Sequence, residues 1–152
     1  MKKTIVPVRQ VRLNDLGYHY LIQVKINGKK SVMLIDTGAS NTVFDKTRIA
    51  RFIKGEEFSS HSKLSTGLGT NSMETMVSVI DTLELGSLVI HGYPAMILDL
   101  HHVNTSYASM KLKPIDGVLG GDVLKKYKAV IDCGKKTISL FFEPSKKKVK
   151  KR

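Results

Sequence analysis

The feature that most constrains this chain is an apolar run that ends in a single carboxylate. Residues 31–35 read Ser-Val-Met-Leu-Ile, and the segment Asp36–Ala39 follows with the sequence Asp-Thr-Gly-Ala. An apolar run of this length, preceded by the turn signal Asn27-Gly28, predicts a buried strand. A carboxylate at the inner end of such a strand loses water, which is costly unless hydrogen bonds or a shared proton compensate. We therefore expect Asp36 to be desolvated and to serve a function.

Length and composition place this feature in one globular domain. The chain has 152 residues, of which 41% are apolar, enough to bury a core. No apolar stretch approaches the roughly 18 residues of a membrane-spanning helix, and residues 1–9 lack the apolar segment of a secretory signal. Cys133 is the only cysteine, so no internal disulfide can form. We expect a cytoplasmic, reducing location and no membrane partner.

The net charge of +12 is concentrated at the C-terminus. Six basic residues lie within residues 146–152, which leaves +6 for the rest of the chain. We therefore divide the chain into a domain of residues 1–144 and a basic, disordered tail of residues 145–152. Such a tail is also compatible with nucleic acid or an anionic surface, but no aromatic residues alternate with its lysines to stack on bases. A solvated tail is the interpretation we prefer, and nucleic acid is not an expected partner.

The pattern of the chain predicts a mostly β fold. Alternating apolar residues indicate strands at residues 6–11 and 18–26, and Asn27-Gly28 is typical of a hairpin turn. The other expected strands are the flanks of residues 61–86, residues 87–98 with an end or interruption near Pro94, a short strand around residues 115–119, and a last hairpin over residues 127–142.

Two short helices complete the expected fold. The first covers residues 45–53, with Asp45 as its N-cap, and the second begins after the glycines at 120 and 121. Residues 99–113 have no clear period, so we expect a surface loop there. No metal-ligand spacing is present among the five histidines and the single cysteine, which indicates neither a metal nor another cofactor.

Three segments, taken in order, resemble a known family. The sequence Asp-Thr-Gly-Ala-Ser after an apolar strand resembles the active-site loop of aspartic proteases. Val118-Leu119-Gly120 with a following helix is similar to the strand that closes the same site, and Gly67-Leu68-Gly69-Thr70 lies between the two segments. This order resembles the single-domain retropepsin-like proteases, roughly from Leu21 to Leu140, and most closely their cellular, bacterial-type members. The resemblance implies a closed β-barrel-like acid protease fold, a homodimer and peptide or protein substrates.

The resemblance also implies roles for individual residues. Asp36 is one half of a catalytic pair in which two aspartates share a proton, have split apparent pKa values and activate water, as is known for aspartic proteases in general. Thr37, Gly38 and Ala39 support the active-site loop, in which Thr37 links the two halves of the dimer. Val118, Leu119 and Gly120 form the site-closing strand.

The segment between these two elements has two interpretations. Gly67, Leu68, Gly69 and Thr70 occupy the place of the flap, a hairpin that closes over the substrate and can pair with its backbone. A plain surface hairpin remains the alternative.

One chain supplies only one such aspartate. Asp116-Gly117 lacks the intervening hydroxyl residue, and Asp132 lies in a predicted hairpin turn. The second carboxylate is therefore expected from another copy of the chain, on the twofold axis of a homodimer. Two alternatives remain open: a non-catalytic peptide-binding or scaffold module with the same fold, and an Asp-Thr-Gly turn without chemistry. The chain also has Ser40 and Gly121 where retroviral members carry an acidic residue and an arginine that pair.

Overall fold

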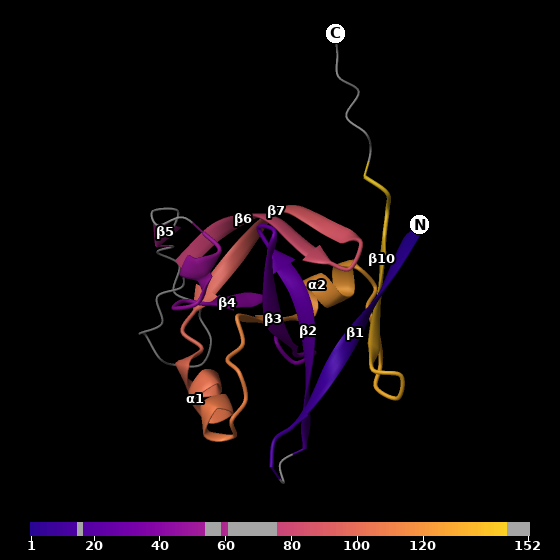
Figure 1. Ribbon diagram of the computed structural model, residues 1–152. Helices are drawn as coiled ribbons and strands as arrows, with labels where there is room; N and C mark the ends of the chain where they lie inside the picture. The colour runs from indigo at the N-terminus through magenta and orange to yellow at the C-terminus, as the bar shows by residue number, and fades with distance from the viewer. Residues whose placement is uncertain (15–16, 54–58, 61–75, 146–152) are drawn as a thin grey trace.

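A computed structural model describes residues 1–14, 17–53, 59–60 and 76–145 (Figure 1). In this part of the chain, strands greatly outnumber helices. The helices are α1 (His101–Ser109) and α2 (Gly121–Lys126), with a single 3-10 turn at Ile49–Arg51. The strands are β1 (Lys2–Arg12), β2 (Tyr18–Ile26), β3 (Lys29–Ile35), β4 (Val43–Asp45), β5 (Ser59–Ser60), β6 (Met76–Leu85), β7 (Leu88–Leu98), β8 (Gly117–Leu119), β9 (Val130–Asp132) and β10 (Thr137–Phe142).

Six of these strands close into a barrel. Their order is β2, β3, β8, β4, β7 and β6, and β6 then pairs back with β2. Asn27 secures this closure, because its N–H donates to the Thr82 carbonyl at 2.8 Å and its side-chain oxygen accepts from the Thr82 N–H at 3.1 Å. Asn27 and Gly28 both have positive φ, as the predicted hairpin turn requires. The expected mostly β, barrel-like fold is thus confirmed.

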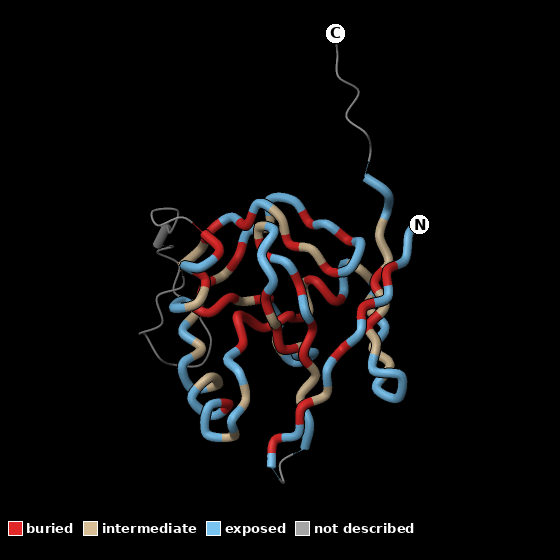
Figure 2. The backbone as a smooth tube through the Cα atoms, in the orientation of Figure 1, coloured by how far each residue is buried: buried red, intermediate tan, exposed pale blue. Residues whose placement is uncertain are grey.

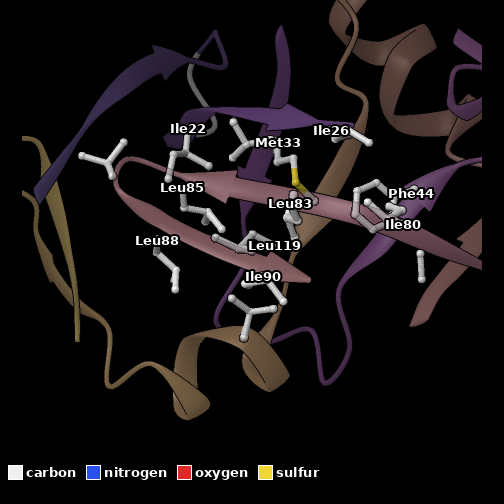
Figure 3. Packing of buried hydrophobic residues seen from close by; sticks show 14 of the residues in the cluster. Ile22, Ile26, Met33, Phe44, Ile80, Leu83, Leu85, Leu88, Ile90 and Leu119 are labelled. Atoms are coloured by element: carbon white, nitrogen blue, oxygen red, sulfur yellow. The ribbon is translucent and has the colours of Figure 1, made fainter. Parts of the chain in front are cut away.

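The barrel interior is a continuous apolar core. Ile22 and Met33 from β2 and β3, Leu83 from β6 and Leu119 from β8 are fully buried and gather between the strands (Figure 3). Buried and exposed residues alternate along β1 and β2, as the period of a strand demands (Figure 2). In β3, Ser31, Met33 and Leu34 are buried and Val32 and Ile35 are half-buried, so the apolar run before Asp36 forms the buried strand that the sequence predicts.

A second sheet lies beside the barrel. The first half of β1 pairs with β10 over Lys2–Pro7, whereas its second half pairs with β2 over residues 8–12. β10 also pairs with β9, and the turn between them is the final hairpin expected from the sequence. β1 therefore leaves the barrel halfway along its length and runs next to β10 (Figure 1).

The prediction of a first helix over residues 45–53 is wrong. The chain forms β4 up to Asp45 and then only the 3-10 turn at Ile49–Arg51. Asp45 is the last residue of β4 and is not the N-cap of this turn, which is Arg48. One oxygen of Asp45 accepts from the Arg48 N–H at 3.1 Å, and its other oxygen accepts from the Leu100 N–H at 2.9 Å. β4 pairs with both β7 and β8. These long-range pairings outweigh the local preference for a helix.

Two further predictions fail between residues 87 and 113. The expected surface loop contains α1, whose one buried side chain, Tyr107, leaves no apolar period to detect. Strand β7 continues through Pro94 without interruption. The pairing of β7 with β4 begins at Met96, so no described strand on that edge needs an N–H from Pro94.

Among the described residues, no helix has the length and apolar character required to span a bilayer.

Candidate active site

The Asp36 loop is fixed against a segment that lies 83 residues later in the chain. β3 and β8 run parallel, with Leu34 opposite Val118 and Ile35 opposite Leu119. The N–H of Asp36 extends this ladder by donating to the Leu119 carbonyl at 3.0 Å. Leu119 is fully buried and Val118 is 7% exposed. The structure therefore brings together the two segments that the sequence singled out.

The loop itself orients the Asp36 carboxylate. Oδ1 of Asp36 accepts from the Gly38 N–H at 2.9 Å, and the Asp36 carbonyl accepts from the Ala39 N–H at 3.2 Å. A Cβ atom at position 38 would lie 3.3 Å from Oδ1, which is a tight contact. Gly38 thus lets the backbone approach the carboxylate closely. One carboxylate oxygen is held by the loop, and no group within the described ranges donates to the other oxygen, Oδ2.

The prediction that Asp36 is desolvated is wrong for the single chain. Asp36, Thr37 and Gly38 are all exposed. The apolar run ends at Ile35, β8 ends opposite it at Leu119, and the loop continues beyond this edge of the barrel. Ile35 is therefore the last residue that the barrel shields in part, and Asp36 lies outside it. The Thr37 hydroxyl also has no hydrogen-bond partner within the described ranges, so the loop presents both side chains to solvent.

Two other aspartates that lie close to glycines have structural roles. Asp116 is 4% exposed, and it accepts from Arg48 Nε at 2.7 Å and from the Val32 N–H at 2.9 Å. Asp132 accepts from the Lys135 N–H at 2.8 Å in the β9–β10 turn. Asp116 thus joins two distant segments of the chain, and Asp132 stabilises a turn. No group of three or more histidine, cysteine, aspartate or glutamate side chains within the described ranges could hold a metal ion.

Backbone hydrogen bonds join the Asp36 loop to α2. The Gly121 N–H donates to the Ala39 carbonyl at 2.7 Å, and the Asp122 N–H donates to the Ser40 carbonyl at 3.1 Å. Ser40 and Gly121 are the positions at which the retroviral pattern has an acidic residue and an arginine. In this chain the backbone itself makes the connection, so the same two segments are joined without a charged pair.

Gly120 makes this close approach possible, and we predict a large difference between the two neighbouring glycines. A Cβ at position 120 would lie 2.5 Å from the Asn41 carbonyl oxygen, whereas a Cβ at position 121 would lie 3.3 Å from the nearest atom, the Ala39 carbonyl oxygen. Gly120→Ala should lower the free energy of unfolding by about 1–3 kcal/mol because the backbone must move. Gly121→Ala is the matched control and should cost clearly less in urea unfolding. Equal losses would show that the Asn41 contact does not matter.

A network of hydrogen bonds behind the loop was not predicted from the sequence. Asp122 Oδ1 accepts from the Thr42 N–H at 2.8 Å and from the Thr42 hydroxyl at 2.7 Å, and Oδ2 accepts from the Tyr93 hydroxyl. The Thr42 hydroxyl in turn accepts from the Gly120 N–H at 2.9 Å. This network connects β7, α2 and the segment after Asp36. Of its members, only Asp122 carries a local sequence signal, because an acidic residue is favoured in the first turn of a helix such as α2.

The network sets the ionisation of its members. Burial opposes ionisation of Asp122, but hydrogen bonds from Tyr93, Thr42 and the Val123 N–H outweigh it, and the pKa of Asp122 lies below its usual range. Burial and the adjacent carboxylate raise the pKa of Tyr93 well above its usual range. At neutral pH Asp122 is therefore an anion and Tyr93 is a neutral donor, as their hydrogen bond requires.

The lowered pKa of Asp122 makes stability depend on pH in a defined direction. A group with a lower pKa in the folded state stabilises the protein above its unfolded pKa of about 3.9, and this contribution disappears as the pH falls through the folded pKa. We predict that the stability difference between wild type and Asp122→Asn is largest above pH ~4 and shrinks below it. Urea unfolding of both proteins across this range measures the difference. A difference that grows as the pH falls would contradict the assignment.

The predicted flap cannot be located. The described residues do not include Gly67, Leu68, Gly69 and Thr70. The strands that follow them in the sequence, β6 and β7, are described. The basic residues 146–152 lie outside the described ranges as well. The roles assigned to these segments from the sequence thus stay predictions.

Comparison with known proteins relates this geometry to one family. Residues 22–123 match a family model described as aspartyl protease. No curated protein sequence matches the chain. Among solved structures, a retropepsin-like aspartic protease from Rickettsia conorii is similar with a TM-score of 0.57 and 18% identity, over 91% of this chain and 89% of that one.

Two more solved structures share the fold. The retroviral protease-like domain of Ddi1 from Leishmania major has a TM-score of 0.54 and 16% identity, over 82% of this chain and 93% of that one. EIAV protease complexed with the inhibitor HBY-793 has a TM-score of 0.54 and 19% identity, over 78% of this chain and 97% of that one. The expected retropepsin-like fold is therefore confirmed.

Proposed function

Because the chain belongs to the aspartyl protease family, we propose that it is an endopeptidase that hydrolyses peptide bonds as a homodimer. The observation that supports this most strongly is the geometry of Asp36. Its carboxylate follows a buried strand, is held by the Gly38 N–H and lies at an exposed edge of the barrel. An oriented carboxylate that substrate and a second subunit can both reach is what the chemistry requires.

The reaction needs two carboxyl groups in different protonation states. In the proposed mechanism one Asp36 is ionised and removes a proton from water, while the Asp36 of the second chain is protonated and donates to the substrate carbonyl oxygen. The water oxygen then bonds to the carbonyl carbon and gives a tetrahedral intermediate with two hydroxyl groups. The carboxyl group that took the proton from water passes it to the amide nitrogen, the other carboxylate takes a proton from one hydroxyl group, and the C–N bond breaks, which restores both starting protonation states. Two carboxylates within about 3 Å cannot both ionise, which produces the required asymmetry without a metal or cofactor.

The rest of the loop supports this role for a dimer. The exposed Thr37 hydroxyl is accessible to the equivalent loop of a second chain, while Gly38 and Ala39 fix the turn through their N–H groups. We further propose that residues 67–70 form the flap and pair with the backbone of an extended peptide. The domain of residues 1–144, the solvated tail of residues 145–152 and a cytoplasmic location belong to the same proposal.

A non-catalytic scaffold is the second candidate. The observation that favours it is the exposed Asp36, which in the described part of the single chain faces no second carboxylate that shares a proton with it. A chain that remains monomeric would keep the fold and lack the catalytic pair. The test of the proposed function is cleavage of a random peptide library by the wild-type chain, with Asp36→Asn as the inactive control. No cleavage by either protein would favour the scaffold, and identical product profiles from both would show that the cleavage does not depend on Asp36.

A further inference from the structure

A groove of about 680 Å³ lies at the side of the barrel, and the proposed catalytic loop does not line it. Strand β1 contributes Val6, Val8 and Arg9 to its wall, and β2 contributes residues 21–25. The groove is thus a separate feature from the Asp36 loop. It has no assigned role in the proposed reaction.

The groove exists because β1 turns away from β2. β1 pairs with β2 only from Val8 onward, and β6 pairs with β2 only at Lys25 and Ile26. Within the described ranges, no strand pairs with β2 on this edge at Gln23 and Val24. β1 and β2 accordingly separate along their length (Figure 1). The unpaired stretch is two residues long, so an extended segment can cross it and approach the β2 backbone there.

Basic side chains surround this opening. Arg9, Lys25, Lys30 and Lys113 line the groove and are exposed, and Glu84 is the one carboxylate that the described residues contribute to its lining. Lys25 lies directly opposite Lys30 in the β2–β3 pairing and opposite Glu84 in the β2–β6 pairing. Like charges opposite one another are unfavourable, and one glutamate cannot neutralise both lysines. An anionic ligand would relieve this repulsion.

The floor of the groove is apolar. Val6, Val8 and Val24 are buried, and Val32 is half-buried. No aromatic residue of the described chain lines the groove, so this lining offers no surface on which a base could stack. The residues at 146–152 of the same chain are basic and would be repelled. An apolar floor with a cationic rim fits a chain in which acidic and apolar side chains alternate.

We propose that this groove binds an extended acidic peptide segment of another protein. The acidic side chains of the segment contact Lys25 and Lys30, its apolar side chains face the valines, and its backbone crosses the gap at Gln23 and Val24. This binding requires neither Asp36 nor cleavage. It would hold an acidic partner at a distance from the proposed catalytic loop.

The experiment measures binding of a fluorescein-labelled, capped octapeptide of alternating Glu and Val to the Asp36→Asn chain by anisotropy. The double variant Lys25→Gln/Lys30→Gln should bind about tenfold more weakly, because two charge contacts are lost. Lys135→Gln/Lys136→Gln in the β9–β10 turn removes the same charge and should bind within about twofold of the parent. Thermal unfolding of the Lys25/Lys30 variant should show little change in stability, since the substitution removes both the repulsion between the two lysines and the attraction between Lys25 and Glu84.

Four results would overturn the proposal. Equal weakening in both double variants would assign binding to the overall charge. Equal affinity for the octapeptide with Gln in place of Glu would exclude recognition of acidic side chains. Tighter, Lys25- and Lys30-dependent binding of single-stranded DNA would make nucleic acid the ligand. Loss of self-association in the Lys25/Lys30 variant would make the groove an interface between copies. None of these outcomes depends on whether the chain cleaves peptides.

Discussion

Asp36→Asn should abolish peptide cleavage, with a loss of roughly 10²–10⁴-fold or more in rate, because an amide cannot take or give the proton that the reaction transfers. The fold should survive the change. Asp36 is exposed, and the amide oxygen of asparagine can still accept from the Gly38 N–H. We therefore expect the free energy of unfolding to change by less than about 0.5 kcal/mol.

The matched control for this variant is Asp81→Asn. Asp81 is also exposed and is also followed by a threonine, but it lies within β6 and has no glycine after Thr82. The substitution removes the same charge, so it separates the chemistry of Asp36 from the effect of net charge. Initial rates on a cleaved library peptide measure both variants. Full activity in Asp36→Asn would end the proposed mechanism, and equal loss in the two variants would point to charge alone.

Asp122→Ala should have the largest effect on stability. It removes the acceptor of three hydrogen bonds and leaves the Thr42 N–H, the Thr42 hydroxyl and the Tyr93 hydroxyl without that partner. Thr42 is fully buried, so its groups cannot turn to water. We expect the free energy of unfolding to fall by about 3 kcal/mol, since each buried group left unpaired costs about 1–3 kcal/mol.

Two variants calibrate this prediction in urea unfolding. Tyr93→Phe removes one donor and leaves both bonds from Thr42 to Asp122, so it should cost about 1–2 kcal/mol. Asp132→Ala removes an aspartate that accepts one hydrogen bond in an exposed turn, and it should cost about 1 kcal/mol or less. If Asp122→Ala were as mild as Asp132→Ala, the network would not stabilise the segment after Asp36.

Local patterns were sufficient to predict the strand before Asp36 and the short strand before Gly120, and the resemblance to the retropepsin-like proteases indicated that the two meet at one site. The run at residues 31–35 and the short segment Val118-Leu119-Gly120 each carry their own signal, and the parallel pairing of β3 with β8 joins them. The exposure of Asp36 was not predictable in this way. It depends on where β8 ends relative to β3, which is a property of the assembled sheet.

The elements that sequence patterns missed depend on long-range contacts. Asp45 was expected to cap a helix, but pairing with β7 and β8 makes its segment a strand. α1 buries only Tyr107, so it shows no apolar period. Tyr93 in β7 reaches Asp122 in α2, across 29 residues of sequence. No local pattern at position 93 indicates such a partner.

The central claim is that two copies of Asp36 act together, and mixing subunits tests it most directly. A fixed amount of wild-type chain is assayed while the Asp36→Asn chain is added in excess. If each active site needs one Asp36 from each chain, a roughly ninefold excess should lower the wild-type rate about tenfold, because wild-type chains become paired with inactive ones. Addition of the Asp81→Asn chain should raise the rate instead. An unchanged rate with excess Asp36→Asn chain would contradict the shared active site.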